Sequence, residues 1–157
     1  MDSGASDIQR VLSLLPSGLF LMTGAFEHAR AGALVTGLIQ CSLHPPCVAV
    51  ALLKGNRLSP IVRDSRAFAL CAVNPTSKLL LRKFAPDTTD TPAAPSDPDP
   101  FDSFEVCTLV SRAPVLSRST AAIDCEVIRH FDFEGDHELY IGQVVGVRES
   151  NGCPPGN

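Results

Sequence analysis

The stretch GALVTGLIQCSLHPP, residues 32–46, is the most informative part of this chain, together with the apolar run Cys47–Leu53 that follows it. Thr36 and Gly37 are adjacent within it, and Ser42 comes shortly before the pair of prolines that ends it. A glycine lets the backbone approach a ligand closely, and amide N–H groups beside a hydroxyl suit a phosphate. The same residues also fit an ordinary pair of bent strands, because glycine within strands commonly marks a bulge. Both interpretations stay open for the stretch taken alone.

The composition indicates one folded domain over residues 1–157. Hydrophobic residues make up 45% of the chain and charged residues 19%, which argues against disorder. The net charge of −4 argues against a nucleic-acid partner, because phosphate binding needs clustered positive charge. The apolar runs are only strand-length, so no membrane span is expected, and the first ten residues lack the basic region of a secretory signal. We therefore expect a cytoplasmic protein.

Five of the six cysteines lie in apolar, strand-like surroundings and are predicted to be thiols that serve as small core residues, whereas Cys153 lies in a Gly/Pro-rich tail and is expected to be exposed. No CxxC pair occurs, so neither a zinc site nor a thioredoxin-type motif is indicated, and no metal is expected. Disulfides are not expected in a reducing compartment. The six cysteines are at positions 41, 47, 71, 107, 125 and 153.

The pattern of apolar residues predicts an all-β protein with a few short helices. Helices are expected over Ser6–Leu15, from Ser59 to Arg63, and from Ser77 onward. Long paired strands with few helices favour a closed barrel, which removes exposed strand edges. The expected strands are Leu19–Ala25, Ala33–Ser42, Cys47–Leu53, Ala67–Val73, Phe104–Val110, Ala121–Phe133 and His137–Arg148.

One segment, Pro86–Glu105, has the composition of a mobile surface loop. It contains five prolines, six acidic residues and no basic residue. A solvated loop is the simple interpretation, and a lid over a ligand is the alternative.

Three places outside the first stretch are candidates for ligand contacts. The turn Lys54-Gly55-Asn56-Arg57 follows a buried strand and could hold an anion through Lys54 or Arg57, or could be a solvated turn. Lys83 and Phe84 end a short helix, where a cation and a core aromatic residue are also ordinary. His137 follows the tight turn Glu134–Asp136, begins an apolar strand and is expected at a barrel rim.

These segments together resemble the flavin reductase family, whose members form an FMN-binding split β-barrel of the Greek-key type. No single piece is strong, but the order and spacing of the pieces match the family from residue 16 to about residue 148. The matching residues are Gly32, Thr36, Ser42, Leu43, Pro45, Pro46, Ser65, Phe68, Val73, Asn74, Phe84, Ala85, Ala113–Leu116, Cys125–Val127, Gly135–His137 and Ile141–Val144.

The resemblance implies an NAD(P)H-dependent flavin reductase that supplies reduced flavin to a partner oxygenase. It implies a homodimer, FMN as the cofactor with FAD as a possibility, NADH or NADPH as the reductant, and His137 beside flavin and nicotinamide. The implied flavin-binding residues are Leu34, Val35, Thr36, Gly37, Ser42, Lys54, Asn56, Arg57, Lys83 and Phe84.

Two departures from the family pattern support other functions. Leu34 stands where relatives usually have threonine, and His44 replaces the aspartate before the two prolines. The chain also stops at Asn157, where relatives often continue. A non-catalytic flavin-binding protein or electron carrier is therefore the alternative, and a barrel with a structural role and no flavin is a third possibility.

Overall fold

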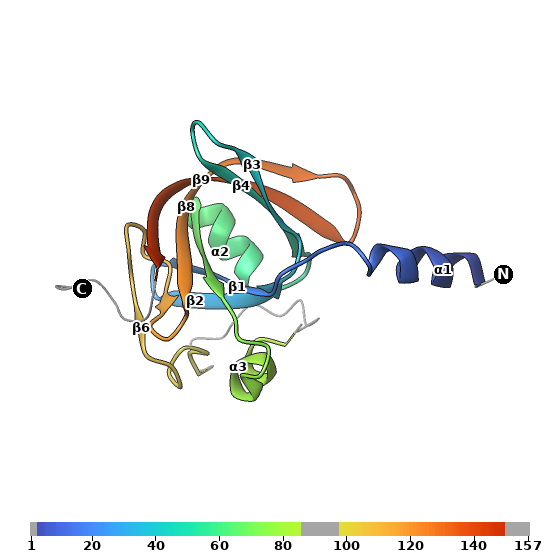
Figure 1. The fold of residues 1–157 in the computed structure, drawn as a ribbon. Coiled ribbons are helices and arrows are strands. Elements are labelled where there is room, and N and C mark those ends of the chain that lie inside the picture. Colours follow the sequence, from blue (N-terminus) through green and yellow to red (C-terminus); the bar gives the residue numbers. More distant parts are fainter. Residues whose placement is uncertain (1–2, 86–97, 150–157) are drawn as a thin grey trace.

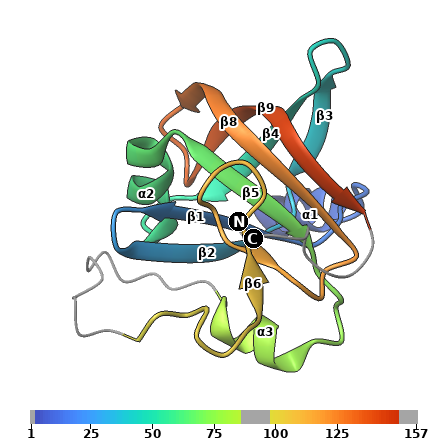
Figure 2. The same ribbon diagram turned by 90° about the vertical axis from the view of Figure 1, so that its left-hand side faces the viewer.

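The fold is mostly β, with three short helices around one large sheet (Figures 1 and 2). The computed structural model describes residues 3–85 and 98–149, with side chains from residue 7 onward. The helices and strands are α1 (Ser3–Leu12), β1 (Phe20–Phe26), β2 (Ala29–Val35), β3 (Leu38–Ser42), β4 (Cys47–Leu53), α2 (Leu58–Ser65), β5 (Ala67–Ala72), α3 (Lys78–Lys83), β6 (Val106–Cys107), β7 (Val115–Leu116), β8 (Ala121–Asp132) and β9 (His137–Glu149).

The main sheet has the strand order β2-β1-β5-β8-β9-β4-β3. Its two edge strands, β2 and β3, are consecutive in the chain and are joined by Thr36 and Gly37 alone. Because such a short connection links the opposite edges, the sheet must curl into a ring, as Figure 1 shows. No ladder of hydrogen bonds joins β2 to β3 in the described residues, so the barrel is split at this connection.

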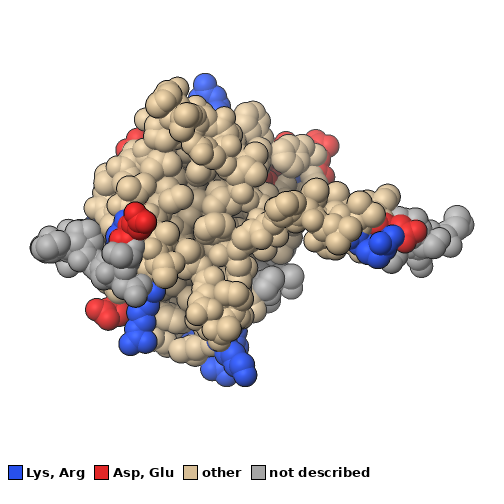
Figure 3. Space-filling view, viewed as in Figure 1, with Lys and Arg blue, Asp and Glu red and all other residues tan. Residues whose placement is uncertain are grey.

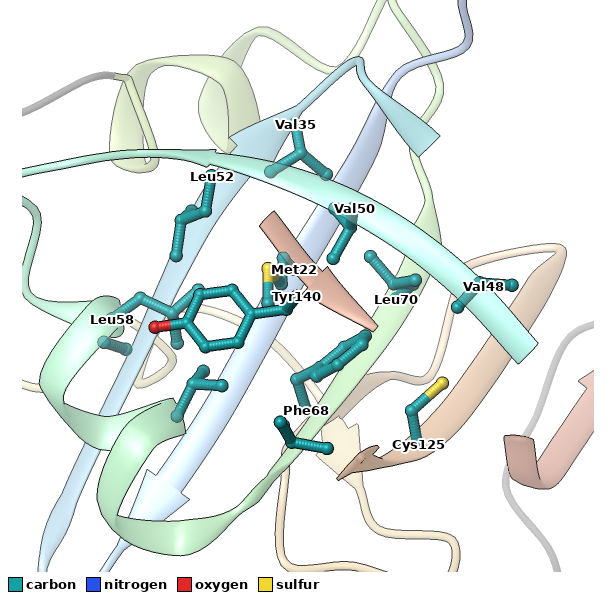
Figure 4. Packing of buried hydrophobic residues seen from close by; sticks show 13 residues of the cluster. Met22, Val35, Val48, Val50, Leu52, Leu58, Phe68, Leu70, Cys125 and Tyr140 are labelled. Carbon is teal, nitrogen blue, oxygen red and sulfur yellow. The ribbon is translucent and has the colours of Figure 1, made fainter. Parts of the chain in front are cut away.

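The barrel interior is filled by apolar side chains from the strands and from α2, which covers one end of the barrel (Figures 1 and 2). Tyr140 of β9 lies in the middle of this core, with its hydroxyl oxygen directed toward Leu58 of α2 (Figure 4). Strand alternation places successive residues on opposite faces. In β1, Met22 therefore packs inside the barrel while Leu21 packs outside, in a second core that includes Phe84 and Phe101.

Two predicted elements have different limits in the structure. The predicted strand Ala33–Ser42 is two strands, β2 and β3, which are separated at Gly37. The Gly37 carbonyl accepts a hydrogen bond from the amide of Ala51 in β4 at 2.8 Å. The predicted helix Ser6–Leu15 ends at Leu12. Its last turn tightens, since the amides of Leu14 and Leu15 bond to carbonyls only three residues earlier.

Residues 98–105 are the described part of the predicted surface loop Pro86–Glu105, and they have no helix or strand, as expected, but are packed against the barrel. Residues 86–97 lie outside the described residues, but Phe101 is buried against Phe84, with ring centroids 5.1 Å apart. Asp99 fixes this part of the chain, because its carboxylate accepts Arg30 Nε at 2.7 Å and the amide of Phe101 at 2.8 Å. The buried ring of Phe101 and the ion pair between Arg30 and Asp99 therefore hold this part of the chain in place, although its composition is that of a loop.

The predicted strand Phe104–Val110 is also shorter than expected. Only Val106 and Cys107 are strand residues, and they pair with β7, which was not predicted. The chain leaves the strand because the amide of Val110 donates to the buried carboxylate of Asp124, at 2.8 Å.

Among the described residues, the prediction of buried core thiols is confirmed at three cysteines and is wrong at two. Cys47, Cys71 and Cys125 are buried free thiols and Cys41 is an exposed one, whereas Cys107 is disulfide-bonded. Burial raises the pKa of the Cys125 thiol to about 12, so this thiol stays protonated. Of the helices in the described residues, none is long and apolar enough to cross a membrane.

Candidate functional site

Two strand ends and one strand connection meet at one end of the barrel. Leu53, the last residue of β4, pairs with His137, the first residue of β9. The connection formed by Thr36 and Gly37 crosses β4 at Ala51. Three residues of a strand span about 10 Å. The connection, the turn after β4 and His137 are therefore within reach of one ligand of nucleotide size.

The turn Lys54–Arg57 is shaped by the side chain of Asn56. The Asn56 Oδ1 atom accepts the amides of Leu58 at 2.8 Å and Ser59 at 3.0 Å, and its Nδ2 donates to the carbonyl of Leu53. These bonds satisfy two of the amide groups that a helix leaves unpaired at its start. Asn56 thus both closes the turn and begins α2.

The charge of Lys54 is already matched by a carboxylate. Its ammonium group is hydrogen-bonded to Asp132 at the end of β8, and this bond lowers the pKa of Asp132. The Lys54 side chain is 30% exposed. Arg57, which directly precedes α2, is half-buried. A phosphate at this turn would therefore compete with Asp132 for Lys54.

His137 lies at the rim of the barrel, as the sequence predicts, with its side chain 46% exposed. Its Nδ1 is 2.8 Å from Oδ1 of Asp136, and the hydrogen bond from His137 lowers the pKa of that carboxyl. An ionised carboxylate only accepts hydrogen bonds, so Nδ1 carries the proton. Among the described residues Nε2 has no hydrogen-bond partner, and it is the ring nitrogen available to a ligand.

A buried polar network lies directly beneath this rim, and the sequence analysis did not find it. Glu138 is 4% exposed, and one of its oxygens accepts hydrogen bonds from Ser59 of α2 and, at 2.9 Å, from the Tyr140 hydroxyl. The other oxygen is 3.1 Å from Nε2 of His130, whose ring stacks on that of Tyr140 at 4.5 Å. The only sequence signal was a glutamate inside the apolar strand ELYIGQVVGV.

The ionisation of this network follows from its hydrogen bonds. Burial by itself raises the pKa of Glu138, but bonds from Ser59, Tyr140 and His130 together hold the pKa below its usual value of 4.5. Burial raises the pKa of Tyr140 to about 12, so its hydroxyl stays a donor. Glu138 is therefore an ionised carboxylate with all its neighbours acting as donors.

The other predicted flavin-binding residues lie in several places. Thr36 and Gly37 are exposed at the strand connection. Val35 and Phe84 are both 4% exposed, with side chains in the two cores, and Leu34 packs against the second core. Ser42 pairs with Cys47, about 20 Å along β4 from the turn, and Lys83 is exposed at the end of α3. Only Thr36, Gly37, the turn and His137 are brought together.

A separate open cavity lies elsewhere in the described part of the chain. This cavity of about 630 Å³ lies between the β1–β2 turn, the end of α2 and residues 110–113, and it shares no residue with the candidate site. Its charged lining residues are of both signs, Glu27, Asp64, Arg66, Arg112 and Glu126. In the described residues, no group of three or more His, Cys, Asp or Glu side chains is placed to hold a metal ion.

Comparison with known families identifies the class of protein that this fold and rim define. The chain matches the model of the flavin reductase like domain over residues 12–156 and belongs to that family.

Individual relatives are similar over most of this chain. It is 27% identical to an NADPH-flavin oxidoreductase from Streptomyces viridifaciens, over 96% of this chain and 78% of that protein. It is 22% identical to diflavin flavoprotein A 1 of Synechocystis sp., over 91% of this chain but only 24% of that protein. The chain thus spans about a quarter of the length of the curated diflavin relatives.

Two solved structures have the same fold. The NADH:FAD oxidoreductase of Streptomyces globisporus superposes with a TM-score of 0.77 at 21% identity, covering 95% of this chain and 85% of that one. The styrene monooxygenase flavin reductase of Pseudomonas putida superposes with a TM-score of 0.72 at 22% identity, covering 91% and 86%. The predicted split β-barrel is thereby confirmed.

Proposed function

We propose that this domain is an NAD(P)H-dependent flavin reductase with its site at the barrel rim formed by the β2–β3 connection, the Lys54–Arg57 turn and His137. The observation that carries the proposal is that these three segments, far apart in the sequence, converge in a domain of the flavin reductase like family. FMN is the proposed flavin, with FAD as the alternative, and NADH or NADPH is the reductant.

The residues present fit a flavin nucleotide. The exposed backbone of Thr36 and Gly37 can lie close to a ring, and Lys54 and Arg57 add positive charge beside the start of α2. With the proton on Nδ1, the neutral ring of His137 can accept a hydrogen bond through Nε2 and so orient the amide N–H of a nicotinamide. Bound flavin supplies the hydride-accepting chemistry, while these residues bind, orient and neutralise charge.

The first experiment is the visible spectrum of the purified protein mixed with FMN, followed by anaerobic addition of NADH or NADPH. Bleaching of the flavin absorbance by either nucleotide supports the reductase. Binding without bleaching supports the alternative, a non-catalytic flavin-binding or electron-carrier protein. Leu34 favours that alternative, because a leucine cannot give the hydrogen bond of the usual threonine.

The phosphate site is tested by removing its positive charges. Lys54→Ala and Arg57→Ala should each weaken FMN binding by about 1.5–3 kcal/mol, the range for a charge-assisted hydrogen bond, and should change riboflavin binding little. Arg118→Ala is the matched control, because Arg118 is an exposed arginine that precedes the start of β8, whereas the turn contacts Asp132 at the other end of that strand. Equal FMN affinity in wild type and both variants would remove the turn from the site.

The wider assembly is also a proposal. We propose a homodimer that supplies reduced flavin to a partner oxygenase in the cytoplasm, where reduced nicotinamide nucleotides are available. The Pseudomonas putida relative is the flavin reductase of a styrene monooxygenase, which supports such a partner. Sedimentation showing only monomer at micromolar concentration would contradict the dimer.

A further inference from the structure

The structure points to a role for the buried network beneath the rim. We propose that Glu138 is a positioning residue: through Ser59 it holds the first turn of α2, and with it the Lys54–Arg57 turn, in place for the phosphate of a flavin nucleotide. This inference rests on the proposed function, because it concerns how the proposed phosphate site is held.

Ser59 alone connects the buried carboxylate of Glu138 to the Lys54–Arg57 turn. The Ser59 hydroxyl donates to Glu138, and the Ser59 amide donates to Asn56, which closes the turn. Ser59 is 5% exposed, so both bonds are made inside the protein. A change at Glu138 therefore reaches the phosphate turn through one residue.

The same strand carries His137 next to Glu138. Successive residues of a strand point to opposite faces, so Glu138 points into the barrel while His137 points to solvent. Pairing with Leu52 and Leu53 of β4 fixes both residues relative to the start of the turn. The hydrogen bond from Ser59 of α2 to Glu138 of β9 thus acts together with the bond from the Lys54 amide to the Asp136 carbonyl, at 2.9 Å, in holding the proposed phosphate contacts at a fixed distance from His137.

If only packing against α2 were needed, an apolar residue would serve at position 138, and a buried carboxylate would be unexpected there. Burying an ionised group costs free energy, and well-packed apolar residues often stabilise a core equally well or better. What a satisfied polar network adds is a single defined arrangement, because each misplacement leaves a buried group unpaired. Here Glu138 accepts bonds from Ser59, Tyr140 and His130, so the start of α2 has one favoured position.

The test compares affinities for FMN and riboflavin, which differ only in the phosphate. Glu138→Ala and Ser59→Ala should each lower the preference for FMN by about tenfold, the effect of losing one charge-assisted hydrogen bond. Glu138→Gln keeps an oxygen acceptor for Ser59 and Tyr140 and should recover part of the preference. Ser59→Ala removes a single hydroxyl and keeps the test valid if Glu138→Ala does not fold.

Asp124→Asn is the matched control, because Asp124 is also a fully buried carboxylate in the β8–β9 sheet. It holds residues 110 and 111 and pairs with Gly146, about 27 Å along β9 from Glu138. This control should lose thermal stability while keeping the wild-type preference for FMN. Hydrogen exchange of the flavin-free protein should be faster over residues 56–62 in Ser59→Ala than in wild type, and unchanged there in the control.

Two results would overturn the positioning role. If wild type prefers FMN and both Glu138→Ala and Ser59→Ala keep that preference, the network does not position the phosphate site, and the proposed function still stands. If wild type itself binds riboflavin as tightly as FMN, the turn is not a phosphate site, and both the positioning role and that part of the proposed function fail.

Discussion

At the scale of single residues, neighbours in the sequence have opposite roles at this site. His137 is half-exposed with a carboxylate partner, whereas Glu138 is buried with three donors. Lys54 is paired with Asp132, while Asn56 in the same turn is used to begin α2. Residue type alone does not decide these roles. They depend on which face of the strand a side chain lies on and on which group it is hydrogen-bonded to.

His137 separates binding from catalysis. If Nε2 orients the nicotinamide, His137→Ala should leave FMN affinity nearly unchanged and slow flavin reduction by roughly ten- to a hundredfold, as expected for one lost orienting hydrogen bond. Anaerobic stopped-flow measurements check this. His28→Ala, at an exposed histidine in the β1–β2 turn, should behave as wild type. A loss of thermal stability without a slower reduction would instead make His137 a structural residue.

Glu138 should also make the stability of the protein depend on pH. Its pKa in the folded protein is below the usual 4.5, so its contribution is present above about pH 4.5 and is lost as the pH falls through the folded value. The difference in unfolding free energy between wild type and Glu138→Gln should therefore shrink below that pH. Urea unfolding at about pH 7 and about pH 4 measures it. A difference that is the same at both values would show that Glu138 is not ionised in the folded protein.

At the scale of elements, the long hairpin of β8 and β9 joins the inside of the barrel to the proposed site. Its close packing depends on a residue without a side chain. A Cβ at Gly142 would lie 2.5 Å from the ring of Phe68 and 2.7 Å from the Cβ of Cys125. Neither neighbour can move without disturbing the core that surrounds Tyr140.

We therefore expect Gly142→Ala to destabilise the protein by about 1–3 kcal/mol, the usual cost of overpacking a core. Gly135→Ala, in the turn of the same hairpin, is the control, because a Cβ there meets nothing within 4 Å. The melting temperatures of the two variants and of wild type, measured by thermal unfolding, test this expectation. Equal melting temperatures for both variants and wild type would mean that β5 and β8 adjust freely around β9.

At the scale of the whole molecule, α1 projects from the barrel (Figures 1 and 3), and its apolar residues are exposed. Ile8, Val11 and Leu12 are 54–63% exposed, although they form one face of an amphipathic helix. The molecular face beside α1 in Figure 3 carries few charged residues. An uncovered apolar face of this kind suits an interface with a second copy of the chain.

If the proposed homodimer uses this face, charged substitutions there should weaken it. The double variant Leu12→Glu with Leu15→Glu should raise the dimer dissociation constant about tenfold or more, because charges would be buried on association. Phe26→Glu, at the exposed last residue of β1, is the control. Sedimentation equilibrium measures both, and a double variant that dimerises like the control would exclude α1 from the interface.

Local pattern was enough to predict most of the long strands, the hairpin after β8 and the rim position of His137, and the resemblance to the flavin reductase family predicted the split barrel. It was enough because strand alternation, turn residues and the order of family motifs are properties of neighbouring residues. The Lys54–Arg57 turn was found for the same reason. The packed residues 98–105 and the split of the predicted strand Ala33–Ser42 were not found, since each depends on a partner distant in the chain.

The remaining decisions were made by tertiary structure. Only the fold decides that Lys54 meets Asp132, that Ser42 lies far from the turn, and that Ser59 reaches Glu138 across 79 positions in the chain. The reason is physical: a side chain's charge, protonation and orientation depend on which groups surround it after burial, and those groups come from other strands. The sequence therefore indicates which chemistry is present, and the curled sheet decides which residues act together.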